Sequence, residues 1–145
     1  MTTFANDYAT VLDKNGTLAF VPHGISMWPF FKNGKQTVII VKKTARLNPL
    51  DVAFYVRGDG TVVMHRVVEV LPDGYVMRGD SHFVCEKVLE DNVIGVLDSF
   101  YVGKTLVKAD DPKYNKRVKR WYKNGKITTF RKKLFHYMQA KNIKR

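Results

Sequence analysis

The sequence predicts a mainly β domain of antiparallel strands and hairpins, followed by a basic, helical C-terminal tail. The apolar runs that precede residue 103 are short, and they are rich in β-branched side chains. Turns that contain glycine separate these runs, as expected for hairpins. After residue 112 the composition changes abruptly to aromatic and aliphatic residues among lysines and arginines. We therefore expect a β domain over residues 1–112 and a basic amphipathic extension over residues 113–145.

Each element follows from its local pattern. The N-terminal pattern predicts a short helix over residues 4–12, a turn over 13–16 and a strand over 17–21. Turns at residues 57–60 (RGDG) and 71–74 (LPDG) place glycine where φ can be positive, so they predict three consecutive antiparallel strands. The remaining apolar runs predict strands at 37–42, 52–57, 62–70, 75–78, 93–97 and 100–102. Alternation in the run 62–70 gives two mixed faces, so neither reads as a plain core face.

The length and the single cysteine limit the class of protein. A chain of 145 residues suits one compact core. Cys85 has no partner for an internal disulfide, so a cytoplasmic location fits better than a secreted one. No run approaches the roughly 20 apolar residues that span a bilayer, and residues 1–15 lack the pattern of a signal peptide. We expect no cofactor, and no metal site, because His82 and Cys85 have no further Cys or His at ligand spacing.

The net charge of +12 belongs to the tail, since residues 113–145 contain 13 Lys and Arg and no acid. A helix is predicted over residues 129–141. Its apolar side is formed by Phe130, Leu134, Tyr137 and Met138. Two interpretations stay open. In one, Trp121, Phe130 and Phe135 insert into the inner face of an anionic membrane. In the other, the apolar side of the helix packs on the β domain and the charged side chains are solvated. Nucleic acid is not expected as a partner, because no known binding motif accompanies the charge.

Ser26 and His65 are the candidate catalytic residues. Ser26 precedes Met-Trp-Pro, where the chain cannot be a regular helix and a bend can expose a hydroxyl. A serine nucleophile needs a base for its proton and donors for the developing oxyanion. His65 is the best base available, and Asp80 and Glu86 both follow the strand that pairs with its own. The plainer alternatives are an ordinary turn serine, a partly buried strand histidine and a turn aspartate that bonds its own backbone.

Four short segments follow one another in a set order. They read GISMWPF (24–30), LDVAFY (50–55), MHRVV (64–68) and MRGDS (77–81). In this order and spacing, over roughly residues 21–97, the chain resembles the signal peptidase superfamily, which also holds the self-cleaving domains of LexA-like repressors. The first segment is similar to the nucleophile box and the third to the box of the general base. The second has Leu50 where the family usually has glycine.

The resemblance implies a signal-peptidase-like or LexA-like β fold for residues 1–112 and a catalytic mechanism. Bacterial signal peptidases hold a lysine where this chain has His65, whereas the archaeal and endoplasmic-reticulum type holds a histidine. The resemblance therefore implies that Ser26 attacks, that His65 carries the proton, and that Asp80 or Glu86 orients the imidazole.

The resemblance also bears on the oxyanion hole and on substrate contacts. Bacterial signal peptidases often carry a hydroxyl two residues before the nucleophile, and here that position is Gly24. Only backbone amides, at Gly24 and Ser26, are then expected to hold the oxyanion. Met27 and Pro29 are expected to contact the substrate.

The predicted function is that of a serine endopeptidase which cleaves a peptide or precursor protein held in extended form beside Ser26. An alternative from another class is a catalytically silent β domain that binds an anionic membrane or nucleic acid through residues 113–145. Cys85 is the least favoured nucleophile, because no shaped turn precedes it. The sequence leaves the oligomeric state open.

Overall fold

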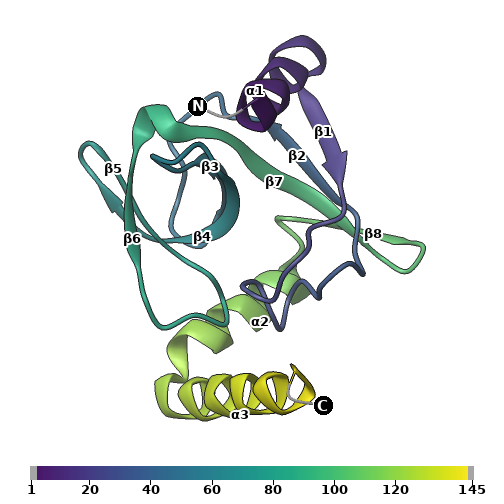
Figure 1. The fold of residues 1–145 in the computed structure, drawn as a ribbon, viewed down its shortest axis with the longest axis vertical. Coiled ribbons are helices and arrows are strands. Elements are labelled where there is room, and N and C mark those ends of the chain that lie inside the picture. Colours follow the sequence, from purple (N-terminus) through teal and green to yellow (C-terminus); the bar gives the residue numbers. More distant parts are fainter. Residues whose placement is uncertain (1–2, 144–145) are drawn as a thin grey trace. The chain divides into compact units, whose positions relative to one another are not determined.

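The computed structural model describes the backbone of residues 3–143 and the side chains of residues 7–142. The chain divides into two compact units, Met1–Ala109 and Asp110–Arg145. The first unit is built on a sheet and the second is helical (Figure 1). The division falls three residues before residue 113, where the sequence predicts the start of the basic extension.

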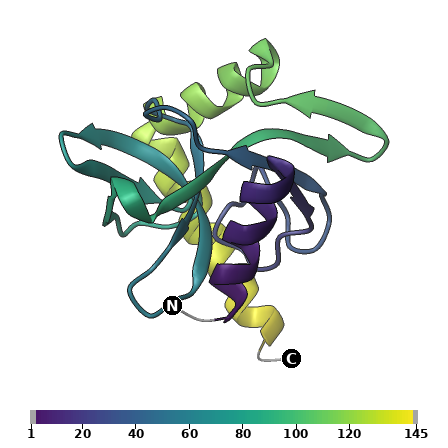
Figure 2. The same cartoon turned by 90° about the horizontal axis from the view of Figure 1, so that it is seen from above.

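Within the described part of the first unit, eight strands join one sheet whose neighbouring strands are all antiparallel. Seven follow the order β1-β2-β7-β3-β4-β5-β6, and β8 pairs with β7 in a hairpin that projects as an arm (Figure 2). The bounds are β1 Thr17–Phe20, β2 Val38–Lys42, β3 Val52–Val56, β4 Val62–Leu71, β5 Gly74–Arg78, β6 Glu86–Leu89, β7 Val93–Val102 and β8 Thr105–Lys108, and a 3-10 helix, η1, spans Glu90–Asn92.

The prediction of a mainly antiparallel β fold with a helical C-terminal region is confirmed. The three consecutive strands expected from the two glycine turns are β3, β4 and β5. Two strands were not predicted, β6 and β8, because each is only four residues long and contains charged side chains. The runs at 93–97 and 100–102 belong to one strand, β7, whose register shifts opposite Ile39 and Ile40.

Helix α1, Thr3–Asn15, is longer than predicted. The expected turn over residues 13–16 is wrong because the helix continues through Asn15 and ends only at Gly16. Gly16 has a φ of +74° and donates its N–H to the carbonyl of Leu12 at 2.9 Å. Figure 1 shows α1 beside β1, and the ring of Tyr8 lies 5.5 Å from that of Phe54 in β3. The helix therefore supplies part of an aromatic wall on this side of the sheet.

The middle of β4 is covered on both faces. Its four residues from Met64 to Val67 are all buried, which explains why alternation did not reveal a core face. His65 and Val67 point to one face and Met64 and Arg66 to the other, by the period of two. Val67 lies in a core cluster with Tyr55, Tyr75 and Met77. The part of β4 that holds the candidate base is thus enclosed on both faces.

The second unit consists of α2, Pro112–Lys123, and α3, Gly125–Ile143. The predicted helix over residues 129–141 lies within α3, but α2 was not predicted. Its signals were present: Asp111 caps the helix by accepting the Tyr114 N–H at 2.9 Å, and Pro112 occupies the first turn. Among residues 3–143, no helix combines the length and the apolar character needed to cross a membrane.

Candidate active site

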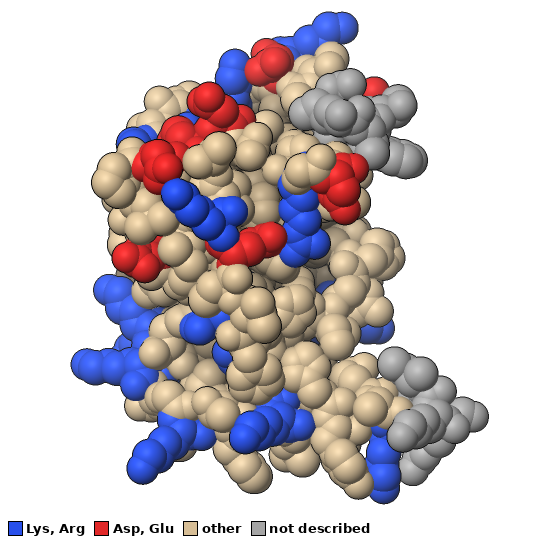
Figure 3. Space-filling model, turned by 60° about the vertical axis from the view of Figure 1, so that its left-hand side comes forward, with Lys and Arg blue, Asp and Glu red and all other residues tan. Residues whose placement is uncertain are grey.

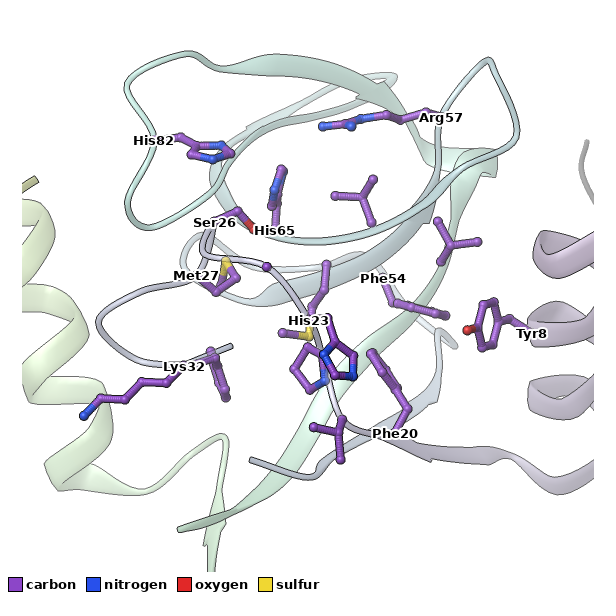
Figure 4. Close-up of a pocket in the computed structure, with 17 residues that line it drawn as sticks. Tyr8, Phe20, His23, Ser26, Met27, Lys32, Phe54, Arg57, His65 and His82 are labelled. Carbon is purple, nitrogen blue, oxygen red and sulfur yellow. The ribbon is translucent and has the colours of Figure 1, made fainter. Parts of the chain in front are cut away.

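A cavity of about 440 Å³ opens in the first unit, and both Ser26 and His65 line it (Figure 4). Ser26 comes from the loop between β1 and β2, and His65 from β4. Met27, expected to bind substrate, also lines the cavity, whereas Pro29 does not. The far wall includes the aromatic rings of Tyr8, Phe20 and Phe54. The space therefore has a polar end around the serine and histidine, and an aromatic wall on the far side from it.

The segment Gly79-Asp80-Ser81 holds the Ser26 loop from behind. Ser81 donates its N–H to the Ser26 carbonyl at 2.9 Å and its hydroxyl to the Ile25 carbonyl at 2.8 Å. Gly79 approaches so closely that an added Cβ would lie 2.7 Å from the Ser26 oxygen, a distance that real Cβ atoms do not adopt. Two segments that the sequence placed in the same pattern are thus joined directly, and glycine is required at the contact.

The two amides expected in the oxyanion hole differ. Gly24 donates its N–H to Asn33 Oδ1 at 2.8 Å, so this amide is occupied. The Ser26 N–H, in contrast, reaches no acceptor among the residues that the structure describes. Of the two expected donors, the amide of Ser26 is therefore the one free to stabilise an oxyanion.

His65 is oriented by a tyrosine that the sequence analysis did not single out. The Tyr55 hydroxyl lies 3.0 Å from His65 Nδ1, and it donates its single proton to Glu86 Oε1. Because that proton is already committed, the phenol oxygen can only accept from His65, which places a proton on Nδ1. The other ring nitrogen, Nε2, is then the unprotonated one. The relay from His65 through Tyr55 to Glu86 leaves the imidazole ready to accept a proton at Nε2.

Arg57 completes this relay at its carboxylate end. Its Nη2 lies 3.0 Å from Glu86 Oε1, and its Nε is 3.2 Å from the same oxygen. Burial opposes ionisation of Glu86, but hydrogen bonds from Arg57 and Tyr55 outweigh it and lower the pKa of the carboxyl. Burial, reinforced by Glu86, raises the pKa of Tyr55, so the phenol keeps its proton. Glu86 Oε1 itself lies 3.7 Å from His65 Nδ1.

Burial is also the main cause of the low basicity of His65. Burial lowers the pKa of the imidazole to about 4; electrostatic interactions with His82 and Arg57 lower it as well, and those with Glu86 and Asp80 oppose them. The His82 ring stands 5.5 Å from that of His65 and also lines the cavity. His65 is therefore neutral at physiological pH, as a general base must be.

Figure 4 shows the Ser26 hydroxyl and the His65 ring at the same end of the cavity. No hydrogen bond joins them within the described part of the chain. Such groups in hydrolases often lie further apart before substrate arrives and tighten in the reacting complex. The structure therefore places Ser26 and His65 at the same end of the cavity, without a hydrogen bond between them.

Of the two carboxylates considered, Asp80 is instead engaged elsewhere. It is fully buried and accepts two hydrogen bonds from Arg66, at 2.8 Å from Nε and 2.7 Å from Nη2. Arg66 also donates to the Leu50 carbonyl at 2.9 Å, and its guanidinium lies 5.4 Å from the centre of the Phe30 ring. Asp80 thus anchors the turn behind Ser26 to the far face of β4, and Glu86 is the carboxylate on the side of His65.

Two further expectations concern cysteine and metals. Cys85 is exposed and does not line the cavity, so it is not placed as a nucleophile for a substrate held there. Across the residues described, no three His, Cys, Asp or Glu side chains gather in a way that could hold a metal ion.

Comparisons with known proteins add no relative. No model of a protein family matches the chain, and no curated protein matches it significantly. The likeness to signal peptidases therefore depends on the four sequence segments alone.

Proposed function

We propose that the protein is a serine endopeptidase with a signal-peptidase-like or LexA-like fold, in which Ser26 is the nucleophile and His65 the general base. The observation that carries the proposal is the hydrogen-bond relay from His65 through Tyr55 to Glu86. A histidine held in one tautomer, neutral, and beside a serine in a cavity has the properties that nucleophilic catalysis needs.

In the proposed reaction, Nε2 of His65 takes the Ser26 proton as Oγ bonds to the carbonyl carbon of the scissile peptide. The electron pair of the carbonyl moves to its oxygen, and the Ser26 N–H stabilises that oxyanion. The imidazolium then gives its proton to the amide nitrogen as the carbon–nitrogen bond breaks. Water, deprotonated by the same histidine, hydrolyses the acyl-enzyme and releases the acid.

Tyr55 and Glu86 act as positioning residues in this scheme. When His65 becomes an imidazolium, its Nδ1–H donates to a phenol oxygen whose own proton is drawn toward an ionised carboxylate. The chain of two hydrogen bonds spreads the new positive charge toward Glu86, and Arg57 keeps Glu86 ionised. The role that the resemblance assigns to a single carboxylate is thus divided here between a tyrosine and a glutamate.

The substrate is proposed to be a peptide or precursor protein that enters the cavity in extended form. Met27 lies beside Ser26, and Phe20 and Phe54 add aromatic rings further along the cavity, so we expect apolar residues to be preferred near the cleaved bond.

The proposal can be tested without a known substrate. The full chain is treated with a fluorophosphonate probe, which bonds covalently to activated serines, and with a degenerate peptide mixture whose products are read by mass spectrometry. Labelling at Ser26 and cleavage are expected in the wild type. Both should fall by about a thousandfold or more in Ser26→Ala and His65→Ala.

Cys85→Ser serves as the matched control, because this exposed thiol lies outside the cavity lining. It should label and cleave like the wild type. Circular dichroism checks that every variant is folded. Cleavage that persists in folded Ser26→Ala would reject the proposed nucleophile, and loss of cleavage in Cys85→Ser would point to the thiol instead.

A further inference from the structure

Helix α3 carries a continuous apolar side that no described part of the second unit covers. Five large apolar residues on this helix are each between 47% and 66% exposed. At 100° per residue they fall within an arc of about 100°, so they form one stripe along the helix. The members of this exposed stripe are Ile127, Phe130, Leu134, Tyr137 and Met138.

The most deeply buried side chains of α3 are polar. Thr128 and Lys132 are 8% and 4% exposed, and the Thr128 hydroxyl donates to the carbonyl of Trp121 in α2. Helices of globular proteins normally bury their apolar side and expose their polar side. The reversal in α3 indicates that the exposed stripe is kept for something other than the folding of the chain itself.

Positive charge surrounds the exposed stripe. Residues 113–145 hold 13 Lys and Arg and no Asp or Glu. Lys126 and Lys133 border the stripe on one side and Arg131 on the other, and all three are exposed. Lys141 follows at the C-terminal end, with its Nζ 5.4 Å from the centre of the Tyr137 ring. In Figure 3 the face drawn carries blue atoms and no red ones over the region of α2 and α3.

We propose that the exposed stripe of α3 lies on an anionic membrane surface. A helix of this kind rests in the interface plane, with its apolar side at the acyl boundary and its lysines and arginines among the headgroups. An anionic membrane accounts for both the positive charge and the apolar stripe. Headgroup phosphates attract the cations, and the acyl region removes Leu134 and Met138 from water.

A nucleic acid would satisfy the charge but not the stripe. Phosphates and sugars offer no cover for aliphatic side chains, and bases would stack only on the aromatic members Phe130 and Tyr137. Lipid is therefore favoured over nucleic acid. The inference does not depend on the chemistry proposed for Ser26, because it uses only residues of the second unit.

The test is co-sedimentation of the full chain with phosphatidylcholine vesicles, with and without phosphatidylserine. The wild type is expected to sediment with the vesicles that contain phosphatidylserine and to stay in the supernatant with phosphatidylcholine alone. The stripe variant is Leu134→Glu with Met138→Glu. The control variant is Thr129→Glu with Ala140→Glu, which adds the same charge at exposed positions of α3 outside the stripe.

If the stripe inserts, the stripe variant should lose more than about tenfold in partitioning, while the control variant loses only the smaller share that added negative charge explains. Circular dichroism confirms that α3 persists in both. Equal losses in the two variants, or equal and negligible binding of the wild type to both kinds of vesicle, would overturn the proposal. So would binding of the wild type to single-stranded RNA without any binding to anionic vesicles.

Discussion

Removal of one hydroxyl, in Tyr55→Phe, tests the relay that orients His65. The substitution keeps the ring in place but deletes the oxygen that lies 3.0 Å from His65 Nδ1 and the proton that bonds Glu86. In the transition state the lost bond comes from an imidazolium, and hydrogen bonds to charged groups contribute about 1.5–3 kcal/mol. Since about 1.36 kcal/mol corresponds to tenfold in rate, kcat should fall by about 10- to 100-fold.

Tyr75→Phe provides the matched control. Tyr75 is another buried tyrosine with a bonded hydroxyl, which accepts the Leu47 N–H at 3.0 Å, but it stands on β5 and is not the tyrosine that contacts His65. Both variants should lose about 1 kcal/mol of unfolding free energy, and only Tyr55→Phe should lose kcat. The assay is steady-state cleavage of a peptide identified in the degenerate mixture, with urea denaturation measured alongside.

A spectroscopic measurement separates orientation from general damage. The ¹⁵N chemical shifts of His65 report which ring nitrogen carries the proton, and the wild type should show the proton on Nδ1. In Tyr55→Phe the two tautomers should both be populated. An unchanged kcat, or a fall no larger than that of Tyr75→Phe, would refute the relay as the device that orients His65.

Three other changes give separate readings of the site. Asp80→Asn leaves a buried guanidinium without its carboxylate, so the unfolding free energy should drop by about 3–5 kcal/mol in urea denaturation; a variant as stable as the wild type would contradict a structural role for this pair. Gly79→Ala should push the Ser26 carbonyl and reduce kcat/KM by about tenfold or more, whereas Gly58→Ala, with open space around it, should be neutral. A loss in both variants, or in neither, argues against the contact. Burial holds the pKa of His65 at about 4 in the folded chain, below the ordinary value of 6.5, so the unfolded chain binds its proton first as pH falls. Stability should therefore decline between about pH 6.5 and 4 by on the order of 3 kcal/mol, and His65→Gln should abolish that part of the decline.

The strands around the site were predictable because their signals are local. The glycine turns at 57–60 and 71–74 flank runs of β-branched residues, and the structure pairs the resulting strands as expected. The short strands β6 and β8 were not predicted, because four residues that include charged side chains give too short a local signal, and each strand forms by pairing with a neighbour.

Ser26 and His65 could be predicted from the sequence, but the side chains that orient His65 could not be predicted completely. The choice between Asp80 and Glu86 depends on which face of β4 each carboxylate approaches, and the chain between them turns in a way that no local pattern reveals. Tyr55 was within reach of inference. In the predicted hairpin, Ala53 pairs with His65. Tyr55 lies two residues after Ala53, so it is on the same face of the sheet as His65 and is its diagonal neighbour.

Gly24 illustrates a different limit. Its amide was expected to help hold the oxyanion, yet the side chain of Asn33, nine residues further along, occupies it. A contact between two loop residues follows from how the loop closes, and neither composition nor periodicity encodes that closure. The exposure of the apolar side of α3 was likewise left open by the sequence, since its spacing fits a buried side and a partner-binding side equally well.

The adjacency of His65 and Arg66 in β4 limits how related sequences can vary. Neighbouring residues of a strand point to opposite faces, so the pair serves the cavity and the Arg66–Asp80 anchor only while nothing separates its members. One residue inserted between them would turn both side chains to the same face. The dipeptide His-Arg, and not either residue by itself, is therefore the mark by which distant relatives with this arrangement should be sought.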